Sequence, residues 1–212
     1  MVNIAICGKM ASGKTTLANN LMSEIENMHK YSLAKAVKDF AHYVYDIPEG
    51  HKDRVAFQKI GDGARKFLYE DVWIDTVLKT VAKDSQKPYV PSGHYDMDGN
   101  DLALDWENPD APMHEYHCII DDVRYLNEVK KLKANGWIII KLEINEDLQK
   151  ERLQNTYPSD WETHFQARNH ASEVEIDYIS EDMVDLVIHA EDNKKALYQV
   201  LNLLFPQCEI LS

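Results

Sequence analysis

Residues 8–15, Gly-Lys-Met-Ala-Ser-Gly-Lys-Thr, match the pattern G-x-x-x-x-G-K-[ST] at every fixed position. Two glycines let such a loop curl so that its backbone N–H groups point inward and form a nest for an anion. In this pattern the lysine gives a positive charge to the β- and γ-phosphates of a nucleotide, and the hydroxyl of the last residue binds Mg²⁺. The motif therefore predicts ATP and Mg²⁺ as cofactors, bound by Gly8, Ala11, Ser12, Gly13, Lys14, Thr15 and Thr16. The alternative is a glycine turn between a strand and a helix.

A second polar group, Asp121-Asp122-Val123-Arg124, is followed by Glu128 one helical turn later. A carboxylate at the carboxyl end of a parallel strand lies near the phosphate loop in α/β folds. We therefore expect Asp121 to serve the magnesium shell, although Asp122 is equally placed for that role. The alternatives are that Asp122 caps a helix and that Arg124 forms a surface ion pair with Glu128.

Two arginines, Arg152 and Arg168, lie in a polar stretch between the last two expected strands. Phosphoryl transfer needs cations that neutralise charge in the transition state and a lid that excludes water. We expect residues 146–182 to form this lid region, with Arg152 and Arg168 as catalytic cations. The alternative is that both arginines are solvated.

The segments that would position these residues have the sequence patterns of an α/β fold. Residues 2–7 form a short apolar run before the glycine loop, which is typical of a strand buried on both faces of a parallel sheet. Residues 14–28 follow it with apolar side chains at helical spacing. Further strands are expected at 117–121, 137–144 and 185–189, and helices at 123–135, 146–156 and 194–205.

Two intervening segments have different characters. Residues 33–83 are mostly helical in pattern, with a break at Pro48 and Gly50. Residues 84–115 contain four prolines, eight carboxylates and one lysine. Such a composition predicts a solvated insertion rather than a core element.

Composition limits the class of protein. The chain has 212 residues, 44% hydrophobic and 28% charged, which suits a single globular domain over 1–212. Its formal net charge of −13 argues against a nucleic acid polymer or an anionic membrane as partner. No apolar run reaches membrane-spanning length. Cys7 and Cys118 lie in apolar runs and read as buried thiols of a reducing compartment, so we expect a cytoplasmic protein.

Several stretches, taken in order, resemble the phage-type deoxynucleoside monophosphate kinases of the P-loop nucleoside monophosphate kinase branch. They are the phosphate loop, the segment Tyr31-Ser32-Leu33-Ala34-Lys35-Ala36-Val37-Lys38, the segment from Phe57 to Asp62 with Trp73, the Asp122-Val123-Arg124 group with Glu128, and His170-x-Ser172-Glu173. Two departures stand out: Asp62 replaces the threonine of that family, and the 84–115 insertion lacks a clear counterpart there.

The resemblance implies a P-loop NTPase three-layer fold with a parallel central sheet, a helical monophosphate-binding subdomain over 33–83, and a lid. It also implies roles for individual residues. Lys35, Lys38 and Arg65 would hold the acceptor phosphate, with Arg124, Asp122 and Glu128 nearby. Trp73 would pack near the base, the alternative being a core position. Asn193 would lie beside the adenine, and a homodimer and location in the host cytoplasm would be expected.

The implied activity is transfer of the ATP γ-phosphoryl group to a deoxynucleoside monophosphate. One rival is a P-loop kinase for another phosphorylated metabolite, such as dephospho-coenzyme A or phosphomevalonate. Another is a nucleotide-binding protein without turnover. A guanine-specific switch would be expected to carry Asn-Lys-x-Asp, whereas residues 193–196 read Asn-Lys-Lys-Ala.

Overall fold

The computed structural model describes residues 1–48, 54–86, 115–166 and 171–207. Its strands are β1 (Asn3–Gly8), β2 (Met28–Tyr31), β3 (His117–Val123), β4 (Ile138–Glu143) and β5 (Leu186–His189). Its longer helices are α1 (Lys14–Glu24), α2 (Leu33–Tyr45), α3 (Arg54–Phe67), α4 (Val72–Asp84), α5 (Leu126–Ala134), α6 (Glu146–Thr156) and α9 (Asn193–Leu204). Two short helices, α7 (Trp161–Gln166) and α8 (Ala171–Val174), and two 3-10 turns, Glu175–Tyr178 and Glu181–Met183, complete the described elements.

The strands form one sheet in the order β2-β3-β1-β4-β5, and every pairing is parallel. Strand β1 lies in the centre, paired with β3 on one side and β4 on the other. Because all strands run the same way, their carboxyl ends meet at one edge, where the loop after β1 begins. Residues far apart in the sequence are thereby brought together at that edge.

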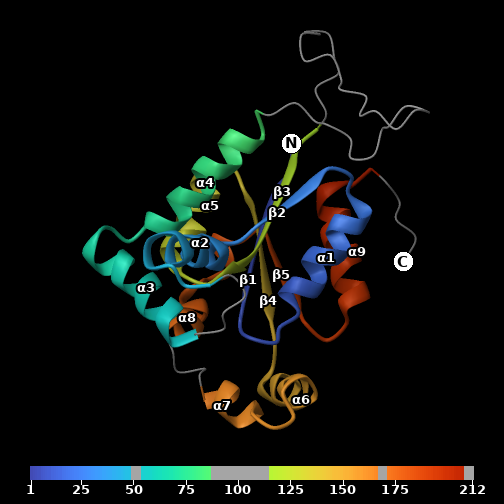
Figure 1. Cartoon of the computed structure of the whole chain (residues 1–212). Helices are drawn as coiled ribbons and strands as arrows, with labels where there is room; N and C mark the ends of the chain where they lie inside the picture. The colour runs from blue at the N-terminus through green and yellow to red at the C-terminus, as the bar shows by residue number, and fades with distance from the viewer. Residues whose placement is uncertain (49–53, 87–114, 167–170, 208–212) are drawn as a thin grey trace, which may run out of the picture.

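Helices cover both faces of the sheet, as Figure 1 shows. One core cluster joins Ile4 and Ile6 of β1 to residues of α1 and α9. The other joins Ala5 and Cys7 of β1 to α2, α4 and α5. The alternation along β1 explains its unbroken apolar sequence, because both faces of this strand are buried. This is the three-layer α/β arrangement with a parallel sheet that the sequence predicted.

The structure corrects the length of one expected helix. The helix expected over 14–28 ends at Glu24, and residues 28–31 form strand β2. Asn27 adopts a left-handed backbone conformation with φ of 56°, which turns the chain between helix and strand. Met28 is buried as expected, but in the sheet and not on the helix.

A similar shift affects the helix expected over 123–135. Strand β3 continues to Val123, so α5 begins only at Leu126. The polar group Asp121, Asp122 therefore lies within the last residues of a strand. Most of the insertion expected over 84–115 falls outside the described residues, as do His170 and Arg168.

Cys7 and Cys118 are buried free thiols, and burial raises the pKa of Cys7 to about 11. Neither thiol is therefore an activated nucleophile at neutral pH. Within the described part of the chain, we find no helix that combines the length and apolar character needed to cross a membrane.

Candidate phosphate-binding site at the carboxyl edge of the sheet

The loop between β1 and α1 has the backbone of a phosphate nest. Gly8 and Gly13 have φ values of 149° and 97°, which strain any residue with a side chain. A Cβ on Gly8 would lie 2.5 Å from the Leu142 carbonyl oxygen of β4. The motif glycines are thus required both by backbone conformation and by contact with the neighbouring strand.

Lys14, the first residue of α1, is folded back over this loop. Its Nζ donates to the carbonyl oxygens of Gly8 and Lys9, each at 2.7 Å. Burial, and next the positive charge of Arg124, lower the pKa of Lys14 from 10.5 to about 8. The ammonium is therefore held by two carbonyl dipoles, and a bound phosphate would restore its ordinary proton affinity.

A cavity of about 660 Å³ opens beside the loop. It is lined by the predicted nucleotide residues Ala11, Gly13, Lys14, Thr15, Thr16 and Asn193. Four cationic side chains, Lys14, Lys30, Arg124 and Arg152, face two carboxylates, Asp121 and Asp122. A chain with a net charge of −13 therefore gathers a local excess of positive charge at this site, as binding of a polyanion requires.

Ser12 does not line this cavity. Its side chain is buried, and its Oγ has no hydrogen-bond partner among the described residues. Of the contacts expected for Ser12, the structure therefore supports only those of its backbone in the loop.

The two neighbouring aspartates have different partners. Asp121 is buried and accepts from the Nζ of Lys30 at 2.7 Å. Asp122 accepts from the Ser32 hydroxyl and from the backbone N–H groups of Leu33 and Ala34, at 2.7, 3.0 and 2.8 Å. Asp122 thus caps the N-terminus of α2, and Asp121 is the carboxylate with fewer hydrogen bonds.

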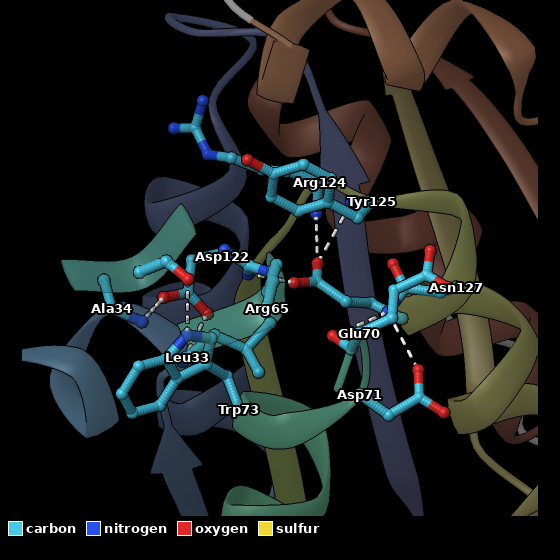
Figure 2. A network of polar contacts seen from close by, with 12 residues as sticks. Leu33, Ala34, Arg65, Glu70, Asp71, Trp73, Asp122, Arg124, Tyr125 and Asn127 are labelled. Atoms are coloured by element: carbon cyan, nitrogen blue, oxygen red, sulfur yellow. Dashed lines mark hydrogen bonds and ion pairs between the residues drawn. The ribbon is translucent and has the colours of Figure 1, made fainter. Parts of the chain in front are cut away.

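The surface pair considered from the sequence is replaced by another partner, because Glu128 pairs with Arg65 and the Arg124 guanidinium points away from Arg65 (Figure 2). The Arg124 guanidinium binds the Glu173 carboxylate of α8. The other Glu173 oxygen accepts from the Met10 backbone N–H of the phosphate loop at 2.8 Å. Glu173, with 2% of its surface exposed, therefore ties Arg124 to the loop.

Arg152 reaches the loop from α6. Its guanidinium donates to the Ala11 carbonyl at 3.1 Å and to the carbonyl of Ala190 after β5. Gln149, one turn earlier, donates to the Met10 carbonyl at 2.9 Å. Arg152 is thus anchored beside the loop and is not fully solvated.

Among the residues expected around the acceptor phosphate, Asp122 and Arg124 line the cavity, but Lys35, Lys38, Arg65, Trp73 and Glu128 do not. Lys35 is exposed on α2 and pairs with Asp39 at 2.6 Å. Lys38 is also exposed. Trp73 is 4% exposed, belongs to the core cluster, and donates its indole N–H to the Gly61 carbonyl at 3.0 Å. For Trp73 the structure therefore favours the core position.

Arg65 and Glu128 form a buried pair between α3 and α5, with N–O distance 2.7 Å (Figure 2). Glu128 also accepts from the backbone N–H groups of Arg124 and Tyr125, at 2.9 and 3.0 Å. Burial raises the pKa of Glu128, while Arg65 opposes that shift. The guanidinium of Arg65 stacks over the Tyr125 ring at 4.2 Å. This pair caps α5 and packs α3 against it.

Two oxygen-bearing side chains of the cavity have the chemistry of Mg²⁺ ligands. Among the described residues no group of three or more His, Cys, Asp or Glu side chains could hold a metal. Thr15 and Asp121 both line the cavity and offer oxygen atoms. Mg²⁺ commonly binds through one or two protein oxygens, nucleotide phosphates and water, so this sparse set is appropriate.

A smaller cavity of about 250 Å³ lies at the ends of β4 and β5. Glu143, Glu191 and His189 are among its lining residues. Its lining has two carboxylates and no lysine or arginine, so the larger cavity is the better site for a phosphate group.

Sequence reasoning missed Lys30, Glu173 as a bridge, and Gln149. Lys30 was overlooked because the expected helix extended to residue 28 and no strand was assigned to residues 28–31, whereas only a strand carries Lys30 to the carboxyl edge. Recognition of β2 before Ser32 would have placed this lysine beside Asp121. The stretch around Glu173 was noted in the sequence, but neither it nor Gln149 signals its contact, because both act on a loop more than 130 residues away.

No protein-family model matches the sequence, and no curated protein matches it either. Solved structures do resemble the fold. A Thermus thermophilus protein, TT1252, aligns with a TM-score of 0.57 at 14% identity over 97% of each chain. Shikimate kinase from Bacteroides thetaiotaomicron aligns with a TM-score of 0.51 at 11% identity, over 96% of this chain and 98% of that one.

A tunicamycin resistance protein from Deinococcus radiodurans also aligns, with a TM-score of 0.51 at 11% identity, over 96% of this chain and 95% of that one. At these identities the likeness concerns the fold alone. The five-stranded parallel sheet with helices on both faces agrees with the fold of these neighbours. The chain therefore has the shikimate-kinase-like P-loop NTPase fold.

Proposed function

We infer that the protein is an ATP-dependent phosphotransferase whose acceptor is itself a phosphate ester, a deoxynucleoside monophosphate. One observation carries this proposal: a single cavity collects the phosphate loop, a buried carboxylate and four cations. A site for the triphosphate alone would need the loop lysine and Mg²⁺. Lys14 and Arg152 contact the loop and Lys30 pairs with Asp121, so Arg124 is the cation that we assign to a second anionic substrate.

The donor half of the site is built from the loop and the residues that hold it. Backbone N–H groups and Lys14 bind the β- and γ-phosphates, and Arg152 and Asn193 lie on the side of α6 and α9. Mg²⁺, held by Thr15 and Asp121 together with the nucleotide, would supply charge neutralisation. Arg124 lines the same cavity from the end of β3, and we assign the acceptor phosphate to its guanidinium.

The proposed reaction does not need a strong general base. The acceptor phosphate is already an anionic nucleophile, so catalysis rests on positioning and on electrostatic stabilisation. Lys14 and Arg124 neutralise charge on the transferred group. The contact of Glu173 with Arg124 and with Met10 fixes the guanidinium relative to the loop, which limits reorganisation during transfer.

The test is ADP release by the purified protein with Mg²⁺ and ATP. The acceptor panel contains the four deoxynucleoside monophosphates, their ribose counterparts, dephospho-coenzyme A and phosphomevalonate, with Lys14→Ala as control. Turnover with one or more deoxynucleotides, lost in the variant, is the expected result. Turnover only with another acceptor would replace the substrate, and ATP binding without turnover on any acceptor would contradict the proposed activity.

A further inference from the structure

The buried carboxylate of the cavity already has a cationic partner from the edge strand. Lys30 lies in β2, in register with Ile119 of β3. Its Nζ is 2.7 Å from Asp121 Oδ2, a distance typical of a charge-assisted hydrogen bond. Asp121 is 6% exposed, whereas the Lys30 side chain is 28% exposed and borders the cavity.

This contact lies within the nucleotide site itself. Asp121 and Thr15 line the same cavity as Lys14. The Asp121 charge also acts on Lys14, whose pKa it raises against the larger lowering by burial. Asp121 therefore interacts with two lysines, with Lys30 by direct contact and with Lys14 through its charge. It lies where a bound Mg²⁺ would need a carboxylate.

We propose that Lys30 is a displaceable counterion of Asp121, which occupies this carboxylate in the nucleotide-free protein and releases it when Mg²⁺ and nucleotide bind. The inference rests on the proposed nucleotide function. A buried carboxylate without a partner is costly, so Lys30 stabilises the empty site. The same ammonium repels a divalent cation that approaches Asp121, so the empty site is stabilised at the expense of magnesium affinity.

The central experiment measures the apparent dissociation constant of Mg²⁺ by calorimetry, with a saturating nonhydrolysable ATP analogue and no turnover. Lys30→Gln removes the charge and leaves an amide that can donate to Asp121. We expect magnesium to bind this variant about tenfold more tightly, because one nearby unit charge commonly shifts ionic equilibria by that factor or more. Unchanged or weaker binding would overturn the proposal.

Two further variants control for charge and for the removal of any lysine. Lys30→Arg keeps the positive charge and should bind Mg²⁺ within about twofold of the wild type. Lys133→Gln removes a lysine of α5 that pairs with Asp185 at 3.7 Å and does not line the cavity. It should also leave the magnesium constant unchanged, and tightening there would show that Lys30→Gln acts only through net charge.

A double-mutant cycle tests whether the effect passes through Asp121. Asp121→Asn should weaken magnesium binding. In the Asp121→Asn background, Lys30→Gln should no longer tighten it. A full tenfold gain that persists without the carboxylate would contradict the displacement of Lys30 from Asp121.

The wild-type protein offers a second measurement that does not depend on the folding of a variant. The acetylation rate of Lys30, read by mass spectrometry with Lys133 as internal reference, should rise when Mg²⁺ joins the protein–analogue complex. No rise, or a fall, would overturn the proposal. If the wild type fails to bind the analogue at all, the proposed function fails. Analogue binding with an unchanged magnesium constant in Lys30→Gln contradicts only this inference.

Discussion

The loop after β1 and the helical segment α2–α4 both carry side chains that the sequence assigns to the site, but the fold uses them differently. Around the loop, Lys14 and Arg152 are held by main-chain carbonyl oxygens, and Arg124 is held by a buried carboxylate. All three border the 660 Å³ cavity. In α2–α4, Lys35 pairs with a neighbour on its own helix, whereas Arg65 and Trp73 bond within the core.

The difference shows what a local motif can and cannot specify. The residues of the loop itself, Lys14 included, are adjacent in sequence, and their geometry follows from glycine positions and the start of one helix. The helical residues would reach a substrate only if three helices were oriented toward the cavity. Instead, Trp73 packs in the core cluster and Arg65 joins α3 to α5, while Lys35 stays exposed on α2.

The largest expected effect is at the loop. Lys14→Ala should lower turnover by about 100-fold or more, because an electrostatic group of this kind commonly contributes that much. The variant should remain folded, since burial of the ammonium is costly for the free protein. Steady-state ADP release together with circular dichroism checks both points, and wild-type turnover in the variant would refute the assignment of the loop.

Substitutions in the helical segment α2–α4 should lower the free energy of unfolding. Arg65→Ala leaves Glu128, 2% exposed, without its guanidinium and should cost about 3 kcal/mol in unfolding free energy. Urea unfolding of the wild type and the variant measures this difference in unfolding free energy. Lys150→Ala removes an exposed pair with Glu146 and should cost less than about 0.5 kcal/mol. Similar losses in both variants would refute a buried structural role for Arg65.

The pKa of Lys14 predicts a pH dependence for ATP binding. In the proposed site ATP binds the protonated ammonium, and a pKa of about 8 means that the free protein loses this proton above pH 8. ATP affinity should therefore fall about tenfold between pH 7 and pH 9, as the protonated fraction falls. Calorimetry at several pH values measures it. Lys14→Arg, which stays charged, should show a flat profile, and the same slope in that variant would assign the titration elsewhere.

The smallest expected effect separates the two regions most sharply. Lys35→Ala should change the KM for the deoxynucleoside monophosphate by less than about twofold, because Lys35 is exposed and outside the cavity. Arg124→Ala should raise that KM more than the KM for ATP. Initial-rate kinetics with each substrate varied in turn decide this. An equal rise in both variants would restore Lys35 to the acceptor site.

Much of the fold was predictable because apolar patterns report burial directly. Four of the strands were expected close to their observed positions, since β1, β3, β4 and β5 are apolar runs beside turn residues. Strand β2 was missed because Met-His-Lys-Tyr is short and mixed, and its strand character comes from pairing with β3. That error concealed Lys30.

By itself, the sequence determined the phosphate loop, the parallel α/β class and the approach of Asp121 to the loop, because each depends on local geometry or on burial. Tertiary structure decided which charges share the cavity. Glu173 joins Met10 to Arg124, Asp122 caps α2, and Lys30 holds Asp121, in each case across more than 45 residues of sequence. Such pairings depend on how strands and helices are placed side by side, and no pattern of neighbouring residues encodes that placement.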